Sequence, residues 1–217
     1  MKILAWDIGI KNLSYCLYEH PNILDWNVID ISQNGKEIFE LQEEMIKQLD
    51  KLPHLYDVDY IVLENQPTFN IKMKTIASAL YTYYVIRGCV DYNRVIKNIH
   101  YIHPKQKLTK CDYDGPIYES TKKQKYSRDK DMAIVYCRYF ITKSNIKWLD
   151  FFESHRKSDD LADSYLHSLA FFNKFVLESL KKTPIEKIKQ MAQEHNIEIT
   201  KKDEMVEKLY KIVRSTI

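Results

Sequence analysis

The stretch that decides the fold is residues 1–12, MKILAWDIGIKN, at the start of the chain. Residues 3–6 form a short apolar run that is typical of a buried strand. The run ends on Asp7, and Gly9 follows in what reads as a tight turn. A carboxylate at the tip of a buried strand is costly unless it is paired or binds a cation. An ordinary strand-to-turn junction has the same composition, so this stretch alone leaves a turn and a site equally open.

Size and composition favour one main domain with a small appendage. The chain has 217 residues, of which 45% are hydrophobic, enough for a substantial core. It contains no apolar run near the ~20 residues of a membrane helix, and a strand pattern begins at once, without a leader. We therefore expect an intracellular soluble protein. The four scattered cysteines predict reduced thiols, and the net charge of +3 requires any nucleic-acid surface to come from local clustering.

The hydrophobic pattern predicts an α/β fold. Apolar runs predict further strands at residues 13–18, 25–31, 58–63 and 94–102, and the short connections between the first three strands predict an antiparallel meander. Helical spacing predicts helices at residues 36–51, 71–90, 127–143 and 158–180. The helix at 71–90 is apolar on more than one face, which suits either a buried core helix or a contact with a partner subunit.

A long polar segment, residues 105–130, carries the strongest local charge. It has eight basic residues against four acidic ones, with tyrosines interleaved. Such a segment suits a surface that follows a phosphate backbone, although a solvated loop has the same composition. The basic residues are Lys105, Lys107, Lys110, Lys122, Lys123, Lys125, Arg128 and Lys130.

Acidic residues mark the start of the helix at 158–180, whose sequence from residue 157 is KSDDLADSYLHSLAFF. Complementarity with the helix dipole explains Asp159 well. It explains Asp163 less well, because that residue lies deeper in an apolar helix. Asp160 and Asp163 are three residues apart and share one helical face.

Four carboxylates therefore stand out. Asp7 and Glu64 end two apolar strands, and the helix carries Asp160 and Asp163. If the first and fourth strands are neighbours, these groups converge, and like charges so close require a cation. Ligands that are all oxygen favour Mg²⁺ or Mn²⁺, and a pair of such ions is the usual clamp for phosphodiester hydrolysis.

Four short motifs, in order, resemble those of the RuvC-like Holliday-junction resolvases, above all the fungal mitochondrial, poxvirus and large-DNA-virus branch. They are D-x-G-x-x-N from Asp7, E-x-Q from Glu64, P-x-x-K ending at Lys107, and D-D-x-A-D at residues 159–163. The resemblance covers roughly residues 1–180. It implies a ribonuclease H-like fold for residues 1–182, with a five-stranded mixed sheet, strands one to three antiparallel, and helices on both faces.

The resemblance also implies an activity. Members of this family are homodimers that cut four-way DNA junctions by paired symmetric nicks, with two metal ions in each active site and no small-molecule substrate. By motif match, the metal ligands are Asp7, Glu64, Asp160 and Asp163, with Asp159 as an alternative to Asp160. Lys107 and Lys130 match the basic residues that the family places near the scissile phosphate. The metal would be Mg²⁺, with Mn²⁺ as a substitute.

Residues 183–217 resemble a SAP motif, a helix, an extended loop and a helix that occur in DNA-repair proteins. Seven basic residues face six acidic ones there. Auxiliary DNA binding and simple packing on the nuclease domain therefore both remain open. Without a transit peptide, a viral replication compartment or the cytoplasm is expected rather than the mitochondrion.

Three other functions use part of the same pattern. Actin-like ATPases also begin with D-x-G, but they need a second phosphate loop and a longer chain. A nuclease that cuts RNA–DNA hybrids would use the same acids as a resolvase. A non-catalytic junction-binding protein would not need all four acids.

Overall fold

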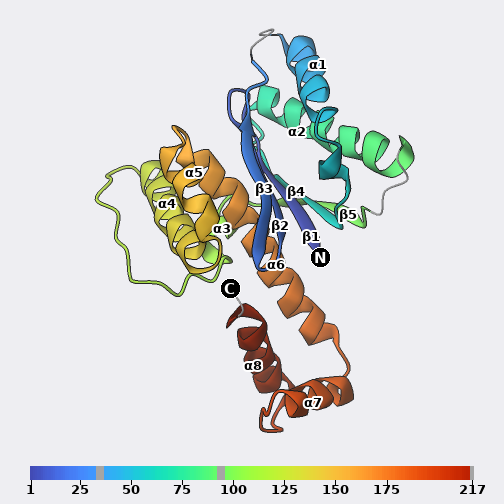
Figure 1. The fold of residues 1–217 in the computed structure, drawn as a ribbon, viewed down its shortest axis with the longest axis vertical. Coiled ribbons are helices and arrows are strands. Elements are labelled where there is room, and N and C mark those ends of the chain that lie inside the picture. The colour runs from blue at the N-terminus through green and yellow to red at the C-terminus, as the bar shows by residue number, and fades with distance from the viewer. Residues whose placement is uncertain (33–36, 92–95, 216–217) are drawn as a thin grey trace.

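A five-stranded mixed sheet forms the centre of the molecule (Figure 1). The computed structural model describes residues 1–32, 37–91 and 96–215. Strands β1 (Lys2–Asp7), β2 (Leu13–Glu19) and β3 (Asn22–Ile29) are antiparallel, whereas β4 (Tyr60–Glu64) and β5 (Asn98–Ile102) run parallel to β1. The order across the sheet is β3-β2-β1-β4-β5. This arrangement confirms the predicted fold class.

Some element boundaries differ from the sequence prediction. The strand expected from residue 25 begins at Asn22, because Asn22 already pairs with Glu19 across a very short reversal. The first residues of the strand expected at 94–102 lie outside the described residues, and β5 itself begins at Asn98. Likewise, residue 36 of the helix expected at 36–51 lies outside them, and that helix begins at Ile38.

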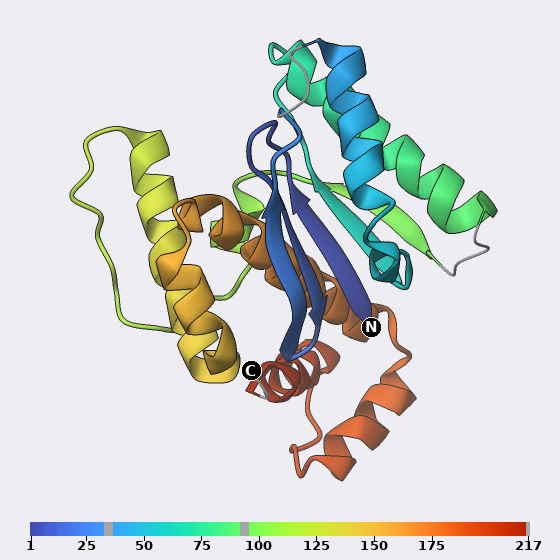
Figure 2. The ribbon, with the colours of Figure 1, turned by 45° about the horizontal axis from the view of Figure 1, so that its top comes forward.

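One face of the sheet is covered by α1 (Ile38–Leu49), the short η1 (Pro53–Tyr56) and α2 (Ile71–Tyr83), which continues as a π-helical segment, η2 (Tyr84–Asp91). Figure 2 shows α1 and α2 lying across this face. Because side chains alternate along a strand, Leu4 and Trp6 of β1 point into this core. Both are fully buried.

The other face is covered by α6 (Ser158–Lys182) and, beyond it, α4 (Lys125–Ser144), η3 (Ile146–Trp148) and α5 (Leu149–Ser154). Ile3 and Ala5 of β1 point into this second core. Trp26 of β3 stacks on Phe152 with ring centroids 5.5 Å apart, and its indole N–H donates to the Leu161 carbonyl at 3.1 Å. This contact fixes the start of α6 against the sheet.

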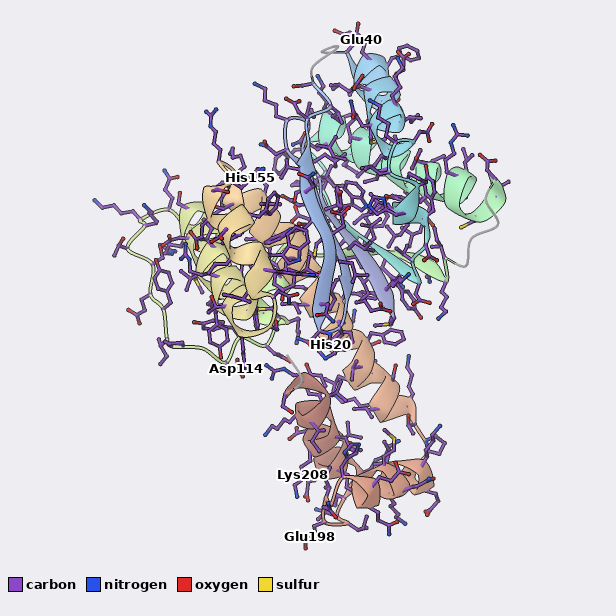
Figure 3. The ribbon with its side chains drawn as sticks, in the orientation of Figure 1. His20, Glu40, Asp114, His155, Glu198 and Lys208 are labelled. Carbon is purple, nitrogen blue, oxygen red and sulfur yellow. The ribbon has the colours of Figure 1, made fainter. Side chains whose placement is uncertain are left out.

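The C-terminal appendage consists of α7 (Ile185–Glu194) and α8 (Lys202–Ser215), which pack on the end of α6 around a small core of their own. Figure 1 shows α6 extending past the sheet to reach them. α8 then returns to the main body, where the Tyr210 hydroxyl donates to Asp112 and the His20 ring donates to the Val213 carbonyl at 3.2 Å. Figure 3 shows His20 near this junction, with Lys208 and Glu198 farther out.

None of the helices in the described parts of the chain is both long enough and apolar enough to cross a bilayer.

Candidate active site

The tips of two neighbouring parallel strands place the first two acids side by side. Trp6 pairs with Leu63 in the register of β1 and β4, and Asp7 and Glu64 come directly after them. The turn after β1 depends on Gly9, where a Cβ atom would lie 2.3 Å from the Asn12 carbonyl oxygen. The first and fourth strands are thus neighbours, which is the condition on which the sequence argument for converging acids depended.

α6 brings a third acid to the same point. Ser164 of α6 lies 2.9 Å from Ser14 of β2, hydroxyl to hydroxyl, and Ser14 pairs with Asp7 in the sheet. Small side chains at this crossing let the helix approach the strands closely, so the preceding residue, Asp163, meets Asp7 and Glu64. One carboxylate oxygen from each of the three acids lies within 4.8 Å of the others.

Lys107 supplies a positive charge inside this cluster. It lies on α3 (Gln106–Thr109), the short helix after β5. Its ammonium group forms an ion pair with Asp163 and lies 3.9 Å from Glu64 Oε2, and the side chain is only 11% exposed. The three carboxylates raise the pKa of Lys107 by more than burial lowers it, so the ammonium stays charged.

The pKa values of the three carboxylates shift in different directions in this environment. Burial raises the pKa of Asp7 well above its usual range, and the charges of Glu64 and Asp163 raise it further. Burial also raises the pKa of Asp163, despite the opposing charge of Lys107. For Glu64, burial is outweighed by the hydrogen bond from His167 and the charge of Lys107, so its pKa falls below the usual value. The metal-free cluster therefore carries more negative charge than it can hold ionised.

This donor set fits a hard cation. It consists of carboxylate oxygens from three elements, without a cysteine or histidine among the three converging groups. Asp163 Oδ1 and Asp160 Oδ2 are buried and have no hydrogen-bond partner among the described residues. A bound cation would satisfy both of these buried oxygen atoms, whereas an ordinary salt bridge would satisfy only one of them.

The two adjacent acids at the start of α6 have different surroundings. Asp159 forms an ion pair with Lys130, whose ammonium lies 3.9 Å from Asp160 Oδ1. Asp160 lines the cleft above the cluster, and burial together with the charge of Asp159 raises its pKa to about 6. Asp160 therefore faces the cleft, although it lies outside the compact group that Asp7, Glu64 and Asp163 form in the described part of the chain.

The cluster lies in a cleft of about 760 Å³. Of the lysines and arginine predicted to bind DNA, Lys105 and Lys125 line this cleft, as do the predicted catalytic residues Lys107 and Lys130. Lys110, Lys122 and Lys123 are exposed elsewhere. Arg128 donates to the Lys123 carbonyl at 2.7 Å, so it braces the end of the polar loop.

Three residues near the site were not singled out from the sequence. Lys11 and Lys157 line the cleft, and His167 lies directly behind Glu64 with Nε2 2.9 Å from Oε2. The spacing of His167, one helical turn after Asp163, was a usable signal. The sequence around Lys11 and Lys157 gave no such signal, because the folding of the chain is what brings these residues to the cleft.

Comparison with known proteins identifies the fold as ribonuclease H-like. Solved Holliday-junction resolvases share this fold. The yeast mitochondrial Holliday junction resolvase Ydc2 superimposes with a TM-score of 0.53 at 17% identity, over 77% of each chain. The fowlpox virus resolvase in complex with Holliday junction DNA gives 0.53 at 19% identity, over 81% of this chain and 99% of its own. Thermus thermophilus RuvC gives 0.50 at 14%, over 78% and 92%.

A sequence relative is found in a large DNA virus. The chain is 35% identical over 153 residues to an uncharacterised protein of Acanthamoeba polyphaga mimivirus. The match covers 66% of this chain and 36% of that protein, so the chain matches little more than a third of the relative's length. No protein-family model matches the chain.

Proposed function

We propose that this protein is a Holliday-junction resolvase, a metal-dependent endonuclease that cuts four-way DNA junctions by paired symmetric nicks. The observation that carries the proposal is the convergence of Asp7, Glu64 and Asp163 within 4.8 Å, with Lys107 among them. The site lies on a fold shared with solved resolvases. In the proposed enzyme, Asp7, Glu64, Asp160 and Asp163 hold two Mg²⁺ ions, which Mn²⁺ can replace.

The bound ions would supply an activated water and stabilise the leaving 3′ oxygen. The protein's own groups then have separate tasks. Lys107, the positive group already at the cluster, would offset negative charge at the scissile phosphate. Lys130, whose ammonium lies 3.9 Å from Asp160 Oδ1, would serve the same phosphate. Asp159 keeps Lys130 in place through their ion pair.

Basic side chains along the cleft would hold the DNA backbone. Lys11, Lys105, Lys125 and Lys157 line it around the acidic cluster. Phosphate contacts of this kind give affinity and register without reading sequence. A cutting site surrounded by lysines suits a substrate recognised by its shape. We also propose that Lys110, Lys122, Lys123 and Arg128 extend this surface along the polar loop.

Paired nicks require two active sites, and we propose a homodimer. An apolar groove of about 510 Å³ runs between α1 and α2, and Ile46, Ala79 and Ile86 line part of it. Ile86 is 46% exposed and Val90, farther along η2, is 70% exposed. A two-fold contact would bury this face against the same face of a second copy.

We propose that residues 183–217 form a SAP-like segment that adds contacts to the DNA arms, with residues 1–182 as the nuclease domain. Lys187, Lys201, Lys208 and Lys211 are exposed on the appendage. Its docking through Tyr210 and Asp112 keeps it close to the polar loop. The mimivirus relative supports a viral replication compartment as the place of action.

A nuclease acting on RNA–DNA hybrids is the second candidate, because its chemistry needs the same acids. The solved resolvases of the same fold make DNA junctions the first choice. A non-catalytic junction-binding protein would have no use for a carboxylate cluster that is costly without a cation.

The test is a cleavage assay with Mg²⁺ and a synthetic four-way junction, beside a linear duplex and an RNA–DNA hybrid of matching sequence. We expect paired symmetric nicks in the junction alone. Asp7→Asn should keep junction binding and lose cutting, whereas Asp150→Asn, exposed on α5 and outside the cleft lining, should cut normally. Equal cutting of the linear duplex, or full activity of Asp7→Asn, would refute the proposal, and preferential cutting of the hybrid would favour the second candidate.

A further inference from the structure

We infer that His167 is a positioning residue for Glu64, which it holds in one orientation toward the cation. The inference rests on the proposed metal site and adds to it a residue that lies behind the ligands. His167 does not line the cleft and would not touch the DNA or the metal. It acts only through the carboxylate in front of it.

The geometry of α6 makes this support possible. His167 comes one helical turn after Asp163, so both side chains leave the helix on the same face. The His167 side chain is fully buried, and its Nε2 atom lies 2.9 Å from Glu64 Oε2. One helix thus carries a proposed ligand and, one turn later, the group that holds a second ligand on β4.

The hydrogen-bond partners indicate which ring nitrogen carries the proton. Nδ1 of His167 is buried and has no partner among the residues that the structure describes. A buried N–H without an acceptor is rarer and less favourable than an unpaired lone pair. The proton therefore belongs on Nε2, which donates to Glu64, while Nδ1 keeps its lone pair.

The remaining contacts of Glu64 leave room for a cation. Oε2 accepts from His167 and faces Lys107 at 3.9 Å, and Oε1 accepts from the Gln66 amide at 3.3 Å. Each carboxylate oxygen can accept about two hydrogen bonds or ligand contacts. Because His167 approaches from the buried side, it fixes the Glu64 rotamer without blocking the side that faces Asp7 and Asp163.

A residue that only fills space would behave differently. A leucine at position 167 has a similar volume and would preserve the packing. It would leave the Glu64 side chain free to rotate and without one of its hydrogen-bond donors. Losing such a support behind a metal ligand typically weakens metal binding by about 10- to 100-fold. A purely structural role would instead lower the melting temperature and leave the metal affinity of the folded protein unchanged.

The experiment compares three substitutions by calorimetric titration of the folded protein with Mn²⁺ in the absence of DNA. Glutamine places an amide N–H near the position of Nε2, and asparagine carries the same group on a shorter side chain. We expect His167→Leu and His167→Asn to weaken Mn²⁺ binding by about 10- to 100-fold and His167→Gln to stay within a few fold of wild type. Leu169→Ala, fully buried on the same helix, is the stability control and should lower the melting temperature without weakening Mn²⁺ binding.

A second measurement needs no metal. In the metal-free protein, the ¹⁵N shifts of the His167 ring should show protonation on Nε2, and Glu64→Ala should change the Nε2 signal. Wild-type-like Mn²⁺ affinity in His167→Leu, or equal weakening in the glutamine and asparagine variants, would overturn the inference. If wild type itself bound no Mn²⁺ while the ring signals showed the hydrogen bond, the proposed metal site would fail and the positioning role with it.

Discussion

Lys107 and Asp163 form a buried ion pair at the centre of the carboxylate cluster, although one comes from α3 and the other from α6. The ammonium group therefore acts as an internal cation. It offsets the negative charge of the cluster in the metal-free protein. Any metal ion that binds must share the same carboxylate partners. This relationship links the stability of the protein to the chemistry of the site.

Lys107→Met should destabilise the metal-free protein, because it leaves Asp163 and Glu64 without their positive neighbour. Removing one partner of a buried pair costs about 3–5 kcal/mol, and proton uptake by the carboxylates reduces this at low pH. We expect a lower free energy of unfolding at pH 7.5, a smaller deficit at pH 5, and partial recovery with Mg²⁺. Urea denaturation measures all three. The exposed Lys147→Met is the control, and equal effects in both variants would contradict the prediction.

Asp160 should make the metal-free protein less stable as the pH rises. Its folded pKa is raised from 3.8 to about 6, so the folded state binds the proton more tightly than the unfolded state. Its stabilising contribution is complete below pH 4 and is lost as the pH rises through 6. Asp160→Asn should therefore stabilise the metal-free protein at pH 7.5 by up to about 3 kcal/mol and change little at pH 3.5.

Denaturation at the two pH values checks the Asp160 prediction. Mg²⁺ should stabilise wild type more than Asp160→Asn, because the variant has lost a proposed ligand. A gain of the same size at both pH values would show that the amide acts through packing rather than through charge.

A charge in the groove between α1 and α2 should separate the proposed dimer. Ile86→Glu places a carboxylate on the apolar face that a second copy would bury. We expect light scattering to give the mass of a monomer for this variant, and the cleavage assay to give single rather than paired nicks. The melting temperature of the monomer should be unchanged. Ile146→Glu, exposed outside the groove, is the control. A dimeric Ile86→Glu, or a monomeric wild type that makes paired nicks, would refute this interface.

Two kinds of variant distinguish the roles of the appendage. Reversing charge at Lys187 and Lys208 should weaken junction affinity several-fold, flatten its salt dependence and leave the melting temperature unchanged. Tyr210→Phe removes the hydrogen bond to Asp112 and should lower stability by about 1 kcal/mol. If the lysine variants bind like wild type while Tyr210→Phe is less stable, the appendage only packs on the nuclease domain. Binding assays at two salt concentrations decide between these outcomes.

Local pattern was enough to predict the strands, most helices and the acids at their ends. The apolar run of residues 3–6 and the spacing of Asp160 and Asp163 are short-range signals, whereas the adjacency of the first and fourth strands was only a condition of the sequence argument. The residues that the sequence missed depend on long-range packing. The spacing of His167 from Asp163 places both on one helical face, but the contact of His167 with Glu64 forms only because α6 crosses the sheet at Ser14.

The choice between Asp159 and Asp160 shows a second limit of the sequence. Both acids occupy the first turn of one helix, and their spacing from Asp163 differs by one residue. Their difference arises from Lys130, which approaches from α4 and takes Asp159 as its closer partner. The π-helical end of α2 was missed for a related reason, because a helical hydrophobic pattern does not distinguish α from π geometry over a few residues.

α6 carries the acids at one end and the appendage at the other, so its length fixes the distance between them. From Asp163 to Leu180 the helix rises by about 25 Å at 1.5 Å per residue. In the proposed enzyme, that length would set how far from the carboxylate cluster the appendage could meet a DNA arm. The number of turns in this single helix therefore fixes the spacing between the carboxylate cluster and the appendage.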